Sequence, residues 1–229
     1  MSRWLVQING SREDLEEFTA WFPSGEVFAM SEADVVFLVG EGLETQTNAS
    51  DALSAAAKGL DELFAVVSLL SPSTRRPEIG GIFREDDAGN RQEQLLLSAA
   101  TVIQLRGRVA IEGSGLTQAQ RLLKGSRKSS SLKNALWIWA DPHRTWPRLY
   151  RMLEEIETHV GLAVDKAGLC MPVTRTRFRQ SANVAQVAGK DARHAAGRFA
   201  SPANPMSFDE ATSFVSGLLQ AVLSKEAGC

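Results

Sequence analysis

The chain has 229 residues, of which 44% are hydrophobic and 23% are charged, a composition typical of a folded protein with a core of its own. Its longest apolar run, within residues 63–70, is much shorter than the ~20 residues that a membrane-spanning helix needs. Two cysteines, Cys170 and Cys229, are too few for a disulfide framework or a four-cysteine zinc site. We therefore expect a cytoplasmic protein without a metal, a cofactor, a membrane span or a secretion signal.

The net charge of −2 conceals a strong separation of charge along the chain. Residues 1–100 carry 7 Lys or Arg and 17 Asp or Glu, whereas residues 101–229 carry 18 and 10. Two interpretations stay open. Either the basic half contacts nucleic acid or an acidic protein partner, or the two halves attract each other within one chain or between the protomers of a homo-oligomer.

The first half of the sequence predicts an alternation of strands and helices. A strand over residues 4–8 precedes a helix that begins at Ser11 and ends before Pro23, because Ser11 with Asp14 forms a capping pattern. Residues 27–30 and 35–39 predict a hairpin with a four-residue connection, and a long helix follows from about residue 51 to residue 70. Further strands are expected over residues 79–83, 95–97, 102–105 and 109–111. This order predicts an α+β fold, in which a mostly antiparallel sheet carries two helices on one face.

The second half predicts almost only helices. Glycine and serine around a short helix at residues 116–123 predict a domain boundary, which divides the chain into an α/β domain, residues 1–115, and a helical domain, residues 116–229. Helices are expected over residues 132–140, 146–160 and 174–188, with a short piece around residue 194. The last helix begins at Ser207, which forms a capping box with Glu210. We expect these helices to form a bundle.

One candidate anion-binding segment is rich in serine and basic residues. Five cationic side chains fall within 13 residues of it: Arg121, Lys124, Arg127, Lys128 and Lys133. Such a segment can neutralise successive phosphates without reading a base sequence. The alternative is a solvated linker between the domains. The aromatic residues that follow, Trp137, Trp139, Trp146 and Tyr150, can stack on unpaired bases, but their helical spacing predicts that most of them lie in the core.

A second candidate site lies between residues 174 and 194. Its side chains are hydrogen-bond donors and one imidazole: Arg175, Arg177, Arg179, Asn183, Lys190, Arg193 and His194. On a helix, Arg175, Arg179 and Asn183 share one face, so that their donors can converge on an anion. Guanidinium neighbours favour the neutral form of an imidazole, whose ordinary pKa is about 6.5, and a neutral His194 can act as a base. The alternative is that these side chains satisfy loop carbonyls within the helical packing.

The helical layout of residues 132–224 resembles the C-terminal halves of uncharacterised bacterial proteins and, more distantly, the HEPN superfamily. The segments that carry this likeness are residues 135–137, 146–150, 154–156, 179–183, 192–194, 205–207 and 210–211. The resemblance implies a helical, often dimeric protein. Members of this superfamily are metal-independent RNases or non-catalytic modules of bacterial toxin–antitoxin and phage-defence systems.

The chain departs from the catalytic signature of that superfamily, an arginine followed by four to six residues and a histidine. Val187, Ala188 and Gly189 occupy the positions at which this arginine would precede His194. Arg193 with His194, or Arg179 with Asn183, would have to replace it. The departure favours a non-catalytic member of the superfamily.

Three functional hypotheses follow. The first is a non-catalytic binding or accessory protein of bacterial type, whose basic half contacts nucleic acid or an acidic partner. The second is a metal-independent RNase in which His194 supplies acid–base catalysis and Arg179 or Arg193 stabilises the charged phosphorane. The third is a structural subunit of a larger complex.

Overall fold

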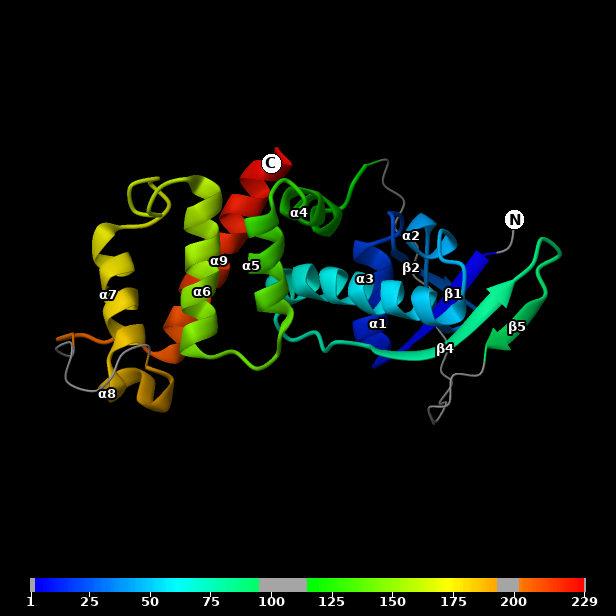
Figure 1. Ribbon diagram of the computed structural model, residues 1–229, viewed down its shortest axis with the longest axis horizontal. Coiled ribbons are helices and arrows are strands. Elements are labelled where there is room, and N and C mark those ends of the chain that lie inside the picture. Colours follow the sequence, from blue (N-terminus) through cyan, green and yellow to red (C-terminus); the bar gives the residue numbers. More distant parts are fainter. Residues whose placement is uncertain (1–2, 95–114, 193–201, 229) are drawn as a thin grey trace. The chain divides into compact units, whose positions relative to one another are not determined.

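The computed structural model describes residues 3–94, 115–192 and 202–228, and the chain divides into two compact units, Met1–Gln120 and Arg121–Cys229. The described part of the first unit holds a sheet and helices, and that of the second holds helices alone (Figure 1). The predicted α+β class is confirmed. The predicted domain boundary between residues 115 and 116 stays a prediction, because compactness does not show that either unit folds independently.

The sheet of the first unit has five described strands, all paired antiparallel. They are β1 (Arg3–Asn9), β2 (Phe28–Glu32), β3 (Val35–Val39), β4 (Glu78–Glu85) and β5 (Arg91–Gln94), in the order β2-β3-β1-β4-β5. The central strand β1 pairs Val6 with both Leu38 and Ile82. All three side chains are buried, as expected for residues at the centre of a sheet that packs on one face against helices.

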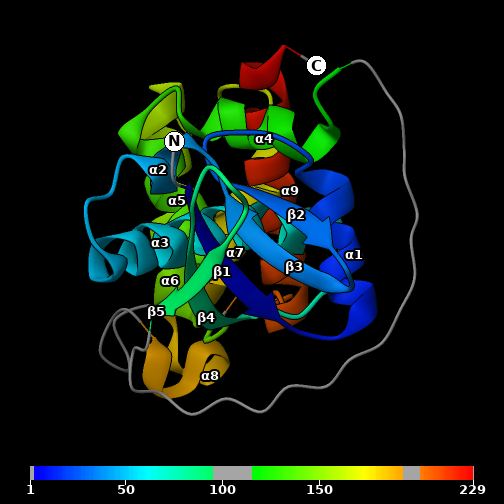
Figure 2. The ribbon, with the colours of Figure 1, turned by 90° about the vertical axis from the view of Figure 1, so that its right-hand side faces the viewer.

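Helices cover one face of this sheet. Helices α1 (Arg12–Trp21) and α3 (Ala49–Leu70) lie behind the strands in Figure 2. Successive residues of β1 point to opposite faces, and on the other face Leu5, Phe37 and Val39 form a second apolar cluster. The partly buried hydrophobic residues Phe28, Met30, Val35 and Phe83 pack against that cluster.

Two turns differ from the sequence-based prediction. The connection between β2 and β3 has two residues, Ala33 and Asp34, and not four, because both adopt a positive φ, 46° and 70°, which suits a tight hairpin. In the next hairpin, the Asp86 carboxylate accepts hydrogen bonds from the backbone N–H groups of Ala88 and Asn90, so that β5 already begins at residue 91. The strands expected at residues 95–97, 102–105 and 109–111 lie outside the described residues. The short helix α2 (Glu41–Glu44) was not predicted.

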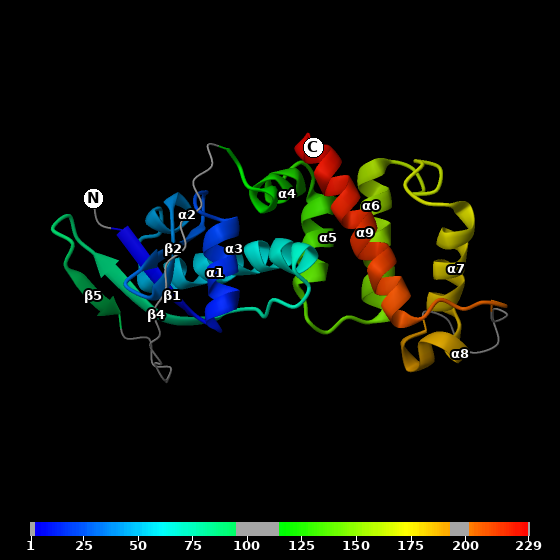
Figure 3. The same ribbon diagram turned by 180° about the vertical axis from the view of Figure 1, so that it is seen from behind.

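The described helices of the second unit are α4 (Gln118–Ser126, most of which belongs to this unit), α5 (Ser130–Ala140), α6 (Trp146–Val160), α7 (Pro172–Asn183), α8 (Ala185–Ala188) and α9 (Phe208–Ala227). Helices α5, α6 and α9 pack against one another. From α7, the fully buried Phe178 stacks on Tyr150 of α6 and contacts Phe214 of α9, with ring centroids 6.1 and 5.5 Å away. Figure 3 shows the same helices from behind.

Several helix boundaries of the second unit agree with the sequence-based prediction, but α4, expected over residues 116–123, spans Gln118–Ser126. The helical piece expected around residue 194 lies outside the described residues. Helix α6 ends at Gly161, and the predicted capping box of Ser207 and Glu210 begins α9. The single helix predicted over residues 174–188 is wrong, because Val184 adopts an extended conformation, φ −108° and ψ 131°, between α7 and α8. Among the described helices, none is both long enough and apolar enough to cross a membrane.

Candidate functional site

The cations of the basic segment are held at the surface of the helical unit. Arg121, Lys124, Arg127, Lys128 and Lys133 are all exposed. They lie on α4, on the turn after it and on the start of α5. The end of α4 is anchored by close packing, because a Cβ atom on Gly125 would lie only 2.5 Å from the carbonyl oxygen of Leu223 in α9. Glycine therefore permits a backbone contact that places this basic segment next to the end of α9.

The aromatic residues of α5 and α6 differ sharply in exposure. Trp139, Trp146 and Tyr150 are buried, as their helical spacing predicted. Trp137 is 69% exposed. Because Trp137 follows Lys133 by four residues in α5, the two side chains share one face of that helix. The exposed indole ring of Trp137 and the exposed side chain of Lys133 therefore lie on the same face of α5.

The donors predicted to converge along α7 instead contact α6 or their own helix. Arg175 donates from Nε to Glu157 Oε1 at 2.6 Å, and the pKa of Arg175 is raised above its ordinary value by this hydrogen bond. Arg179 donates to the hydroxyl of Tyr150 at 3.1 Å. Asn183 donates to the carbonyl oxygen of Arg179 at 2.7 Å. The three residues were predicted to share one helix face and to bind an anion there. Their donors instead form hydrogen bonds with acceptors of the protein itself.

The other residues of this second candidate site are separated. Arg177 donates to the carbonyl oxygens of Asn204 and Pro205 and to the carboxylate of Glu210, which ties α7 to the start of α9. Lys190 is exposed in the 3-10 turn Gly189–Asp191. Arg193 and His194 lie outside the described residues, so their proposed catalytic roles stay predictions.

Ser129, His159 and Glu226 form a polar network that the sequence analysis missed. Ser129 Oγ lies 2.9 Å from His159 Nδ1, and His159 Nε2 lies 3.3 Å from Glu226 Oε1. The three residues come from the N-cap of α5, the last turn of α6 and the last turn of α9. These helix ends meet at one end of the unit (Figures 1 and 3). Ser129 and His159 are 30 residues apart in the sequence, and His159 and Glu226 are 67 residues apart, so no local sequence pattern could have predicted this network.

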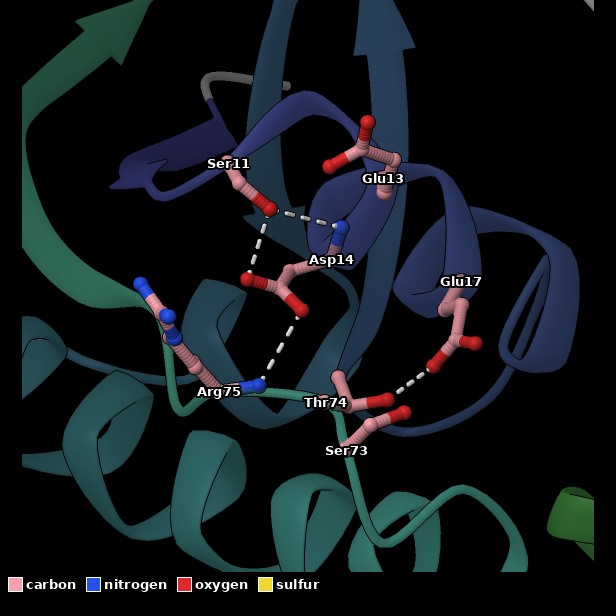
Figure 4. A pocket seen from close by; sticks show the side chains of 7 residues that line it. All are labelled: Ser11, Glu13, Asp14, Glu17, Ser73, Thr74 and Arg75. Carbon is pink, nitrogen blue, oxygen red and sulfur yellow. Dashed lines mark hydrogen bonds between the residues drawn. The ribbon is translucent and has the colours of Figure 1, made fainter.

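A polar hollow of about 320 Å³ lies in the first unit (Figure 4). Three acidic residues and Arg75 line it, together with Ser11, Ser73 and Thr74; the acidic residues are Glu13, Asp14 and Glu17. Two of these carboxylates accept hydrogen bonds from the segment that follows α3. Asp14 accepts from the backbone N–H of Arg75 at 3.0 Å, and Glu17 accepts from Ser71 and Thr74. These contacts fasten α1 to the segment that follows α3, which is a structural task.

The described residues contain no group of three or more His, Cys, Asp or Glu side chains that could hold a metal ion. Burial is the main cause that raises the pKa of the Cys170 thiol, which makes this cysteine a poor nucleophile. Comparison of the chain with families of proteins, with curated proteins and with solved structures found no match. The resemblance to the HEPN superfamily therefore stays a prediction.

Proposed function

We propose that the helical unit binds single-stranded nucleic acid through the basic segment and Trp137. The observation that carries this proposal is the 69% exposure of Trp137 on the face of α5 that also bears Lys133. Cationic side chains neutralise phosphates, and an exposed indole offers a surface on which an unpaired base stacks. The protein would then act as a binding or accessory protein, and this activity needs no chemical step.

The distribution of charge supports this proposal. Residues 121–229 carry 16 Lys or Arg and 9 Asp or Glu. Five of these acidic side chains pair with arginines of α6 and α7: Asp141 with Arg148, Glu155 with Arg151, Glu157 and Asp165 with Arg175, and Glu210 with Arg177. Lys124 and Lys128 form no ion pair with any described residue. These acidic groups thus neutralise the arginines of α6 and α7. The ammonium groups of Lys124 and Lys128 therefore remain available to bind a negatively charged ligand.

Trp137 favours a single strand over an acidic protein partner. Stacking of one base on an aromatic side chain contributes about 1–3 kcal/mol, and an acidic peptide offers charge but no comparable ring. Bases in a duplex are stacked on each other and are not open to the indole. Binding of an acidic polypeptide in place of nucleic acid would contradict the proposal.

The salt dependence of binding tests the role of the basic segment. We expect the affinity of the full-length protein for a labelled single-stranded oligonucleotide, measured by fluorescence anisotropy, to fall as salt rises. The logarithmic slope should be about −0.7 for each phosphate contacted, and Lys124→Ala with Lys128→Ala should reduce its magnitude by roughly 1.4. Lys166→Ala is the matched control, because Lys166 is exposed in the connection between α6 and α7. A salt-independent affinity, or an equal effect of the control, would contradict the proposal.

Substitutions of Trp137 test the stacking role separately. Trp137→Ala should weaken binding by about 1–3 kcal/mol, which corresponds to roughly 5- to 150-fold, because one base loses its stacking partner. Trp137→Phe should retain most of the affinity, since a smaller ring still stacks. The same variants should change binding to a duplex of equal length much less. An equal loss for single strand and duplex would rule out stacking.

A further inference from the structure

We propose that Ser129, His159 and Glu226 form an acyl-transfer site, in which Ser129 is the nucleophile, His159 the base and Glu226 the residue that positions the base. The class of substrate is a carboxylic ester or thioester with an anionic leaving group. This inference does not depend on nucleic-acid binding.

The order and spacing of the groups carry the proposal. A serine hydroxyl is activated when a base lies within hydrogen-bond distance and a third group orients that base. Here the two distances are 2.9 Å, from Ser129 Oγ to His159 Nδ1, and 3.3 Å, from His159 Nε2 to Glu226 Oε1. In the tautomer that fits both contacts, Nδ1 of the imidazole accepts the hydrogen bond of the Ser129 hydroxyl, and Nε2, which faces the carboxylate, carries the ring proton.

The local structure holds these groups firmly but leaves them accessible. Ser129 Oγ also accepts the backbone N–H of Leu132 at 3.1 Å, so that the hydroxyl is oriented from two sides. The side chains of His159 and Glu226 are 15% and 31% exposed. A substrate can therefore reach the network from solvent, while the surrounding helices restrict the rotamers of its members.

The start of α5 supplies hydrogen-bond donors beside the nucleophile. Backbone N–H groups in the first turn of a helix have no partner within that helix. Ser130 and Ser131 occupy these positions directly after Ser129. Their N–H groups can therefore stabilise the negative charge that develops on a carbonyl oxygen when Ser129 attacks.

The reaction conserves every proton and electron pair. Ser129 Oγ forms a bond with the carbonyl carbon and transfers its proton to His159 Nδ1. The bond from this carbon to the leaving oxygen or sulfur then breaks, and the imidazolium protonates the leaving group. Water then attacks the acyl carbon while His159 takes one of its protons. The bond between this carbon and Ser129 Oγ breaks, the imidazolium returns the proton to Oγ, and a carboxylic acid is released.

Charge around the network favours an anionic leaving group. Lys128 directly precedes Ser129, and Lys225 directly precedes Glu226; both lysines are exposed. Lys124, in the last turn of α4, is exposed as well. A carboxylate or phosphate on the leaving group would be attracted to these ammonium groups.

Covalent labelling of the full-length protein tests the nucleophile. Incubation with a fluorophosphonate probe should give one adduct, which peptide mass spectrometry locates at Ser129. Ser129→Asn keeps a side-chain acceptor for the helix cap but removes the nucleophile, so it should abolish labelling without loss of helical structure. His159→Gln should slow labelling at least about 100-fold, within the range expected for loss of a general base. Ser213→Ala, at an exposed position of α9, is the control and should label normally.

Turnover separates the roles of the remaining residues. Hydrolysis of 4-acetoxybenzoate, whose leaving group carries a carboxylate, should exceed that of its methyl ester, and Lys128→Ala should remove this preference. Glu226→Gln should lower kcat and leave KM almost unchanged, whereas Glu226→Asp should restore part of kcat. A folded protein that is not labelled at Ser129, or that is labelled equally fast after His159→Gln, would overturn the proposal whatever its affinity for nucleic acid.

Discussion

Glu85 shows how single charged residues stabilise the sheet of the first unit. Its carboxylate accepts hydrogen bonds from Arg3 Nε at 2.6 Å and from Arg91 Nε at 2.7 Å. Arg91 also pairs with Glu32 and lies over the ring of Phe37. The hydrogen bond from Arg3, followed by that from Arg91, lowers the pKa of Glu85 below its ordinary value of 4.5. This group of charges connects β1, β2, β4 and β5 on the face that carries the second apolar cluster.

The lowered pKa of Glu85 makes the stability of the first unit dependent on pH. A carboxylate whose pKa is lower in the folded state contributes stability above its ordinary pKa, and this contribution is lost as the pH falls through the folded-state value. At pH 7, Glu85→Gln should therefore reduce the free energy of unfolding by about 1–2 kcal/mol, because the substitution removes the charge-assisted hydrogen bonds to the two arginines. The difference from the unmodified protein should shrink towards pH 3.

Urea unfolding at several pH values provides the measurement. Glu93→Gln is the matched control, because Glu93 is exposed on the neighbouring strand β5. We expect its free energy of unfolding to follow that of the unmodified protein. A constant effect of Glu85→Gln from pH 7 to pH 3 would show that the ion pairs do not account for it.

At the scale of elements, the contact between α4 and α9 determines how the basic segment and Ser129 are held. Gly125→Ala would place a Cβ atom 2.5 Å from the Leu223 carbonyl oxygen, so one backbone must shift. We expect a loss of about 1–3 kcal/mol in the free energy of unfolding. Gly217→Ala in α9 is the control, because nothing lies within 4 Å of its Cβ position. Alanine there should stabilise the helix by about 0.5–1 kcal/mol.

Thermal unfolding of the two alanine variants distinguishes packing from helix propensity. Opposite shifts in Tm are expected, downward for Gly125→Ala and upward for Gly217→Ala. If both variants became more stable, the close approach of α4 to α9 would be disproved. The contacts of Ser129 would then also lose their support from α4.

At the scale of the whole molecule, we expect a mutation in the core of either unit to destabilise mainly the unit that contains it. Leu60 of α3 and Leu149 of α6 are both buried, with exposures of 0% and 1%. Either leucine replaced by alanine should cost about 2–5 kcal/mol in the unit that contains it. Hydrogen exchange should accelerate in β1 and α3 for Leu60→Ala, and in α5, α6 and α9 for Leu149→Ala. Equal acceleration throughout the chain in both variants would show that the two units unfold together.

The sequence by itself determined the class of fold, most helices and the separation of charge. The helices could be predicted because each pattern that indicates them lies within a few residues along the sequence. Apolar spacing identified α6, and the Ser207 capping box identified the start of α9. Such patterns missed the extended residue Val184 and the two-residue turn at Ala33, because backbone conformation there is not specified by hydrophobic periodicity.

Only the tertiary structure decided which polar side chains are available for a ligand. The sequence placed Arg175 and Arg179 on one helix face, but the fold brings α6 against that face, and Glu157 and Tyr150 accept their hydrogen bonds. The fold likewise places Ser129, at the start of α5, within hydrogen-bond distance of His159 in α6. The physical reason is that periodicity records which side of a helix is apolar, whereas the partner of a charged or nucleophilic group depends on which distant segment packs beside it.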